Sequence, residues 1–110
     1  MKNPTLTIVI CARNEEASIG QLLQSLISQN HRNFEITNIV VVSDGSTDKT
    51  VDLVKSITSP KITLHEYQKS MGKAYRLRQI YSTLVSDLVV QLDSDITLCS
   101  INFLDYLVKP

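Results

Sequence analysis

The sequence has no excess charge of either sign and no long apolar run. Its 110 residues contain 11 lysines and arginines against 11 aspartates and glutamates, so it lacks the basic balance of most nucleic-acid-binding proteins. No uncharged apolar stretch approaches the roughly 18 residues that a membrane helix needs, and the apolar run near the N-terminus is too short for a secretory signal. We therefore expect a soluble, cytoplasmic protein with no nucleic-acid partner.

Cysteine, glycine and proline are also scarce. The chain has 2 cysteines, 3 glycines and 3 prolines, and turn-forming residues fall singly, without linkers or repeats. Cys11 and Cys99 stand among apolar residues without metal-ligand spacing, so we expect buried free thiols in a reducing compartment. The length and the absence of linkers together indicate one domain.

Short apolar runs alternate with segments of helical periodicity. The runs predict strands over residues 6–11, 39–43, 62–66 and 88–92, each followed by a helix with one apolar face. Asn14 is the expected N-cap of the first helix, with acidic residues in its first turn, and Ser46 or Thr47 the expected N-cap of the second. This alternation predicts an α/β, Rossmann-like fold: a mainly parallel sheet of about four strands, flanked by helices on both faces.

Polar clusters follow three of the predicted strands. Parallel sheets bind ligands beyond the carboxyl ends of their strands, and those ends carry "CARNEE", "SDGSTD" and "DSD". Asp93 and Asp95 lie one residue apart after the fourth strand, so their side chains point to the same side. Their oxygens suit Mg²⁺ or Mn²⁺, which take one or two protein carboxylates and complete their shell with phosphates and water. The alternative is a pair of solvated loop aspartates that cap the next helix.

The stretch "SDGSTDKT" is explained mostly by structure, since Gly45 permits a tight turn and the following residues suit a helix start. Asp44 is left over. At the end of its strand, this carboxylate is placed to accept hydrogen bonds from a ligand.

A concentrated positive field lies further along the chain, made by Lys69, Lys73, Arg76 and Arg78. Such a run is usually a solvated helix face. In the functional alternative, Lys73 reaches a diphosphate beside Gly72, and the arginines face an anionic acceptor or a lipid surface.

The segments "ICARNEE", "VVVSDGSTDKTVDLV", "GKAYRLRQ" and "VVQLDSDI", in this order, resemble family 2 glycosyltransferases of the GT-A fold. The resemblance covers nearly the whole chain but only the N-terminal, nucleotide-binding half of the family pattern. It implies a nucleotide-sugar site with Mn²⁺ or Mg²⁺ as cofactor. The roles it implies are a nucleoside pocket lined by Ala12, Arg13 and Glu15, a base contact from Asp44, a ribose contact from Asp93, a metal ligand in Asp95 and a phosphate contact from Lys73.

The resemblance also implies transfer of a sugar from a nucleotide-diphosphate sugar to an acceptor. The acceptor, whether saccharide, lipid or protein, stays open, and peripheral association with a membrane is compatible with the basic cluster. Three positions depart from the family pattern: Cys11 replaces a frequent proline, Ser43 an aspartate and Arg78 an asparagine.

The catalytic residue of such a transferase is not identified in this sequence. In the family, the base lies well beyond the DxD motif, which Asp93 and Asp95 form in this sequence. The only acid after Asp95 is Asp105, which we expect on a solvated helix face. We therefore expect residues 1–110 to be a domain truncated after this motif, able to bind the donor but not to transfer its sugar. Two alternatives are a non-catalytic α/β binding module and a nucleotidyltransferase. Nucleotidyltransferases have a glycine-rich phosphate loop after the first strand, which the stretch "CARNEEASIG" does not match.

Overall fold

Four parallel strands form the centre of the molecule. The computed structural model describes residues 3–108. Its strands are β1 (Thr5–Ala12), β2 (Glu35–Asp44), β3 (Ile62–Tyr67) and β4 (Leu88–Asp93). They stand in the order β3-β2-β1-β4, and every neighbouring pair is parallel. The four predicted strands are confirmed. Strands β1, β3 and β4 extend by one residue beyond a predicted end, and β2 begins at Glu35 rather than at residue 39.

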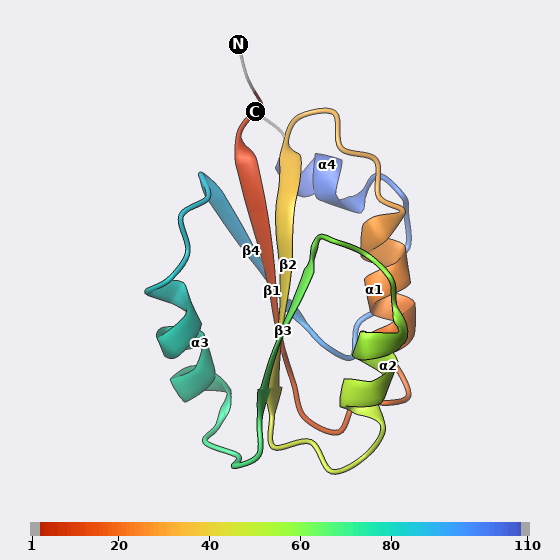
Figure 1. The fold of residues 1–110 in the computed structure, drawn as a ribbon. Helices are drawn as coiled ribbons and strands as arrows, with labels where there is room; N and C mark the ends of the chain where they lie inside the picture. Colours follow the sequence, from red (N-terminus) through yellow and green to blue (C-terminus); the bar gives the residue numbers. More distant parts are fainter. Residues whose placement is uncertain (1–2, 109–110) are drawn as a thin grey trace.

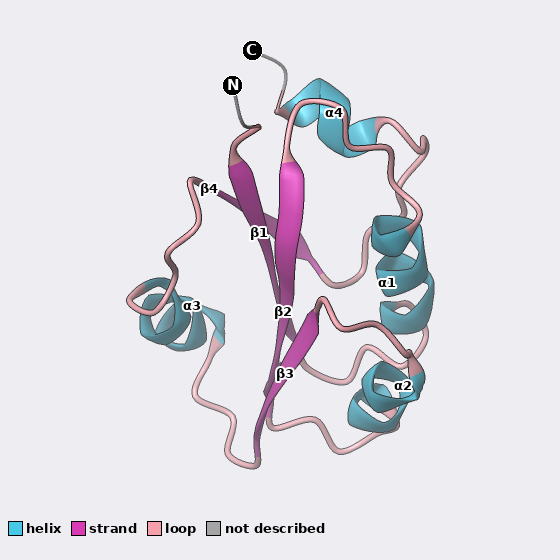
Figure 2. Ribbon diagram, turned by 45° about the horizontal axis from the view of Figure 1, so that its top comes forward, coloured by secondary structure: helices cyan, strands magenta, loops and turns pink. Residues whose placement is uncertain are grey.

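Helices cover both faces of this sheet (Figures 1 and 2). They are α1 (Ile19–Ile27), α2 (Thr50–Ser56), α3 (Lys73–Tyr81) and α4 (Phe103–Leu107). Helix α3 lies on one side of the sheet, and the other three helices lie on the opposite side. The predicted α/β, Rossmann-like architecture with covered faces is therefore confirmed.

The core has two layers because strands β1 and β2 alternate their side chains between the two faces. Ile8 and Ile10 belong to the larger cluster, which α1 completes with Leu22 and other apolar residues. Val9 faces the other way and belongs to the cluster that contains Ile80 of α3. Burial on both faces explains why these strands read as continuous apolar runs. Each fully buried aliphatic side chain contributes about 1.5–3 kcal/mol.

The predicted N-caps of the first two helices are wrong. Helix α1 begins at Ile19 with no acidic residue in its first turn, and α2 begins at Thr50. Asn14 has a φ of 53°, and its side-chain oxygen accepts hydrogen bonds from the Thr47 and Asp48 amides. These polar residues thus join the loop after β1 to the loop after β2 instead of capping the helix next in sequence.

The C-terminal part of the structure is less buried than its apolar sequence predicts. Helix α3 ends at Tyr81 and buries Arg76 and Ile80, whereas Val85, in the segment between α3 and β4, is 98% exposed. Strand β4 is a sheet edge, and Leu92 is its only buried residue.

Two smaller expectations near the C-terminus also fail. Asp105 is buried in α4 and accepts a hydrogen bond from the Arg32 amide, so it does not lie on a solvated face. Cys99 is exposed and Cys11 half-buried, although both are free thiols as predicted. No helix among residues 3–108 has the length and apolar character needed to cross a membrane.

Candidate donor-binding site

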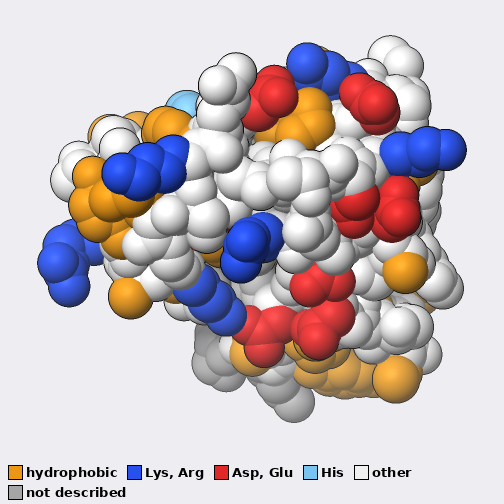
Figure 3. Space-filling model, turned by 90° about the horizontal axis from the view of Figure 1, so that it is seen from below, with side chains coloured by type: hydrophobic (Ala, Val, Ile, Leu, Met, Phe, Trp, Pro, Cys, Tyr) orange, Lys and Arg blue, Asp and Glu red, His pale blue; other side chains and the backbone are white. Residues whose placement is uncertain are grey.

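A cavity of about 460 Å³ opens at the carboxyl ends of β1, β2 and β4. Acidic and basic side chains gather at this end of the molecule (Figure 3). The seven predicted site residues all line this one cavity: Ala12, Arg13, Glu15, Asp44, Lys73, Asp93 and Asp95. Cys11, Ser70, Gly72 and Ser94 complete the lining. The predicted convergence is confirmed, while the roles assigned to single residues stay predictions.

Strand register brings these residues to the same level. In the pairing of the central strands, Cys11 lies opposite Asp93 on one side, and Ala12 lies opposite Ser43 on the other. The loops that follow are joined to each other. The Glu15 amide donates to the Thr50 hydroxyl at 2.8 Å, and the Ser18 hydroxyl lies 2.9 Å from the carbonyl oxygen of Ser94. These hydrogen bonds therefore connect the segment after β1 to the segments that follow β2 and β4 at the rim of the cavity.

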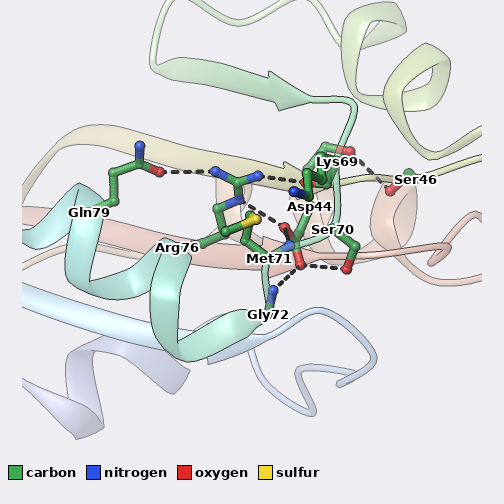
Figure 4. A network of polar contacts seen from close by, with 9 residues as sticks. Asp44, Ser46, Lys69, Ser70, Met71, Gly72, Arg76 and Gln79 are labelled. Carbon is green, nitrogen blue, oxygen red and sulfur yellow. Dashed lines mark hydrogen bonds and ion pairs between the residues drawn. The ribbon is translucent and has the colours of Figure 1, made fainter.

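Asp44 is buried at the base of the cavity with all its acceptor positions used (Figure 4). Its Oδ1 accepts from the Met71 amide and from Arg76 Nε, both at 2.8 Å. Its Oδ2 accepts from the Gly72 amide at 2.9 Å and from the Ser70 hydroxyl at 3.1 Å. A carboxylate offers about four acceptor sites, so the protein itself saturates Asp44.

These hydrogen bonds hold Asp44 in its charged form. Burial alone would raise the pKa of Asp44, because a charged group loses solvation in the protein interior. The bonds from the Met71 amide, the Arg76 guanidinium, the Gly72 amide and the Ser70 hydroxyl outweigh burial and lower the pKa from 3.8 to about 2. Asp44 is therefore a carboxylate throughout the physiological pH range.

Arg76 is the residue of this site that the sequence reasoning missed. Its side chain is 5% exposed, so it belongs neither to a solvated helix face nor to a surface for an acceptor or a lipid. Its guanidinium lies 3.8 Å from the ring centre of Tyr67. One signal in the sequence was available: Arg76 stands four residues before Ile80, at the spacing that places two residues on one helix face. The other basic residues of the cluster, Lys69, Lys73 and Arg78, are exposed.

Gly45 allows the loop after β3 to approach this site closely. Its φ is 73°, in the left-handed region, and a Cβ atom at this position would lie 2.7 Å from the Ser70 nitrogen. Real Cβ atoms do not approach backbone so closely, so any larger residue would displace the loop. The glycine of "SDGSTD" therefore serves both the turn after β2 and the packing against residues 69–72.

Lys73 and Asp93 form a second ion pair at the exposed side of the cavity. Lys73 Nζ donates to Asp93 Oδ1, and the two side chains are 48% and 60% exposed. This hydrogen bond to the carboxylate raises the pKa of Lys73. Asp95 is also exposed and lines the same cavity. This side of the cavity thus presents charged groups that a ligand is able to reach.

The carboxylates suit a divalent metal that is shared with a ligand. Among residues 3–108, no three metal-ligating side chains cluster closely enough to hold a metal alone. Mn²⁺ and Mg²⁺ bound with a nucleotide need only one or two protein carboxylates, because phosphate oxygens and water complete the shell. Asp95, with Asp93 beside it, meets that smaller requirement.

The chain matches the profile of "Glycosyl transferase family 2" over residues 7–109. The 4,4'-diaponeurosporenoate glycosyltransferase of Staphylococcus aureus (strain USA300) is 33% identical to it over 94 residues, which are 84% of this chain and 24% of that protein. The chain thus spans about a quarter of the length of the curated relatives it matches.

Solved structures of glycosyltransferases share the fold. Mannosyltransferase PcManGT from Pyrobaculum calidifontis, in complex with GDP-Man and Mn²⁺, is 26% identical with a TM-score of 0.80, covering 100% of this chain and 34% of that one. Glucosyl-3-phosphoglycerate synthase from Mycobacterium tuberculosis, with Mn²⁺, UDP and glucosyl-3-phosphoglycerate, is 24% identical with a TM-score of 0.76, covering 97% and 39%. The profile match spans nearly the whole chain and the fold is that of GT-A structures, so this chain belongs to glycosyl transferase family 2.

Proposed function

We propose that the cavity binds the nucleotide-sugar donor of a glycosyltransferase together with Mn²⁺ or Mg²⁺. The observation that carries this proposal is the convergence of seven residues from separate parts of the sequence on one cavity. They come from the ends of β1, β2 and β4 and from the start of α3. Charged groups of both signs stand there, as binding of a metal and a diphosphate requires.

The part of the cavity near the ends of β1 and β2 would hold the nucleoside. Ala12, Arg13 and Glu15 would line its pocket, and Asp44 would meet the base. Four protein donors already bond to Asp44, so a base N–H would have to share an oxygen or replace the Ser70 hydroxyl. That hydroxyl makes the longest of the four bonds, at 3.1 Å.

The exposed side of the cavity would hold the ribose and the diphosphate. Asp93 would accept from a ribose hydroxyl, Lys73 would contact the phosphates, and Asp95 would ligate the metal. When bound, the metal supplies Lewis-acid stabilisation of the charge that grows on the leaving nucleoside diphosphate. The Lys73–Asp93 pair is half exposed, so each partner is able to exchange the other for a ligand group at little cost.

The relatives support a role in sugar transfer. The curated relatives are named glycosyltransferases, and PcManGT was solved with GDP-Man and Mn²⁺. We propose that the sugar of the bound donor passes to a hydroxyl of a saccharide, lipid or protein acceptor. The match to the glycosyl transferase family also favours this function over that of a nucleotidyltransferase.

Replacing Asp95 tests the proposal directly. Asp95→Asn keeps the side-chain shape but removes the charge that a divalent metal needs. Isothermal calorimetry with UDP and GDP in the presence of Mn²⁺ should show affinity falling more than tenfold, about 1.4 kcal/mol or more. Asp52→Asn is the matched control, because Asp52 is an exposed acid on α2 outside the cavity.

The wild-type chain should bind at least one of the two nucleotides, and the binding should weaken when Mn²⁺ is removed by a chelator. If neither nucleotide binds to the wild-type chain, the proposed function of the cavity is wrong. If Asp95→Asn binds as tightly as Asp52→Asn, the proposed metal role of Asp95 is wrong. Absence of all nucleotide binding would favour a non-catalytic module.

A further inference from the structure

Arg76 is a buried charge inside a helix that otherwise presents its basic residues to solvent. We infer that Arg76 is a positioning residue of the proposed donor site: together with Asp44 it holds residues 69–72 in the conformation that builds one wall of the cavity. This inference rests on the proposed function for its effect on nucleotide binding. The contacts that carry it are all between groups of the protein itself.

Each residue of the segment 69–72 is bonded to Arg76 or to Asp44 (Figure 4). Arg76 Nη2 donates to the Lys69 carbonyl oxygen at 2.6 Å. Asp44 accepts from the Ser70 hydroxyl and from the amides of Met71 and Gly72. Arg76 Nε donates to Asp44 and so joins the two sets of contacts. The ion pair thus forms hydrogen bonds with all residues of the segment 69–72.

The segment has little else to fix its backbone. Within residues 3–108, the backbone groups of residues 69–71 make no hydrogen bond to another backbone group. Gly72 has a φ of 96°, which few other residues adopt. Without the Arg76–Asp44 pair, the segment would keep the bond from the Arg76 amide to the Gly72 carbonyl oxygen, the contact against Gly45 and its covalent ends.

The segment contributes directly to the cavity. Ser70 and Gly72 line it, and Gly72 leads into Lys73, the proposed phosphate contact. A shift of residues 69–72 would therefore move hydroxyl, amide and ammonium groups together. Arg76 itself is absent from the lining, so it acts on a ligand only through these groups.

A guanidinium is the side chain that these contacts require. Arg76 donates from Nε to Asp44, from Nη2 to Lys69 and from Nη1 to Gln79, the last at 3.2 Å. Three donors in one plane are a property of arginine, whereas lysine carries one compact ammonium. Arg76→Lys should keep the charge beside Asp44 but lose some of the hydrogen bonds to Asp44, Lys69 and Gln79.

Replacing Arg76 by a neutral residue should also leave Asp44 buried without its charged partner. The titratable groups around Asp44 are Arg76 and Lys73 from α3, Cys11 from β1 and Tyr67 at the end of β3. Of these, Arg76 alone is bonded to the carboxylate. In Arg76→Met the pKa of Asp44 should rise, since burial favours the neutral acid. Nucleotide binding by Arg76→Met should then weaken more than binding by the wild-type chain when the pH is lowered from 7 to 5.

The experiment compares Arg76→Met, Arg76→Lys and the control Arg78→Met, which removes an exposed charge from the same helix. Calorimetry with Mn²⁺ should show UDP and GDP binding alike reduced at least tenfold in Arg76→Met, less in Arg76→Lys and not at all in Arg78→Met. The extra pH dependence should appear only in Arg76→Met. A folded Arg76→Met protein with wild-type affinity and pH profile would overturn the inference; if that variant does not fold, wild-type affinity in Arg76→Lys would do so.

Amide hydrogen exchange separates this inference from the proposed function. The Met71 and Gly72 amides should be protected in the wild-type chain and in Arg78→Met, and should exchange at least tenfold faster in Arg76→Lys. If the wild-type chain bound no nucleotide but showed this pattern, the proposed function would fail while the positioning role of Arg76 stood. Equal protection in all three proteins would overturn that role whatever the nucleotide result.

Discussion

Helix α3 carries two ion pairs, three residues apart, in opposite environments. The side chains of Arg76 and Asp44 are 5% and 4% exposed, while those of Lys73 and Asp93 are 48% and 60% exposed. Both pairs join a basic residue of α3 to an aspartate at the end of a strand, and both aspartates line the same cavity. The chemistry is therefore similar, and the difference lies in solvent access.

This difference separates a fixed part of the site from an exchangeable part. Removing one partner of a buried pair leaves an uncompensated charge in the interior. This destabilises the protein by far more than the intact pair stabilises it. An exposed pair contributes about 0–1 kcal/mol, and water or a ligand replaces either partner readily. We expect the Arg76 pair to define the shape of the cavity and the Lys73 pair to open for the ligand.

Breaking the buried pair should give the largest effect. Arg76→Met should lower the free energy of unfolding by about 3–5 kcal/mol, because the Asp44 carboxylate stays buried without its partner. Urea denaturation followed by circular dichroism measures this change. Arg78→Met, the control on the exposed face of α3, should change the free energy by less than about 0.5 kcal/mol. Equal effects of the two substitutions would contradict the comparison.

Acid should break the same pair with a smaller effect. The pKa of Asp44 is lowered in the folded protein from 3.8 to about 2, so its stabilising effect is fully present above pH 3.8 and is lost as the pH falls towards 2. The shift corresponds to about 2 kcal/mol of folding free energy.

Carbon-detected NMR titration of the aspartate side chains checks this expectation. The Asp44 carboxyl should stay ionised at pH 3, where carboxyls of ordinary pKa are mostly protonated. An Asp44 that titrates near pH 4 would show that the four hydrogen bonds do not form as described.

Breaking the exposed pair should have the smallest effect on stability. Lys73→Met should change the free energy of unfolding by no more than about 1 kcal/mol, because both partners are largely solvated. The same variant should weaken binding of UDP and GDP alike, as a phosphate contact does not distinguish bases. Denaturation and calorimetry on one preparation give both numbers. A loss of stability close to that of Arg76→Met would remove the distinction between the two pairs.

The sequence was sufficient to predict which residues meet at the cavity. Asp44 and Asp93 each end an apolar run, and the carboxyl ends of parallel strands lie at one edge of a sheet. The alternation of strand and helix periods therefore predicted that the polar clusters after three strands meet at one edge of the sheet. The resemblance to family 2 glycosyltransferases added the proposed roles, which the geometry permits and binding experiments have to test.

The sequence was insufficient where long-range contacts override local preference. Asn14 looks like a helix cap but bonds to Thr47 across two loops. Arg76 looks like a solvated residue, since arginine is rarely buried without a partner, and its partner Asp44 stands 32 residues earlier in the chain. Apolar residues of β4 suggested a buried strand, yet its place at the edge of the sheet depends on strand order, which hydrophobic periodicity does not encode.

Strand order also has a consequence for how the protein folds. Central strand β1 pairs with β4, and at the start of these strands Thr5 bonds to Asp87, 82 residues later. Closing so long a loop costs more entropy than forming the nearer pair β1 and β2, and parallel pairings of this kind slow folding. A growing polypeptide would thus possess Asp44 and the loop after β1 before Asp93 and Asp95 had emerged from the ribosome. Recognition of a nucleotide would accordingly have to wait until β4 docks against β1.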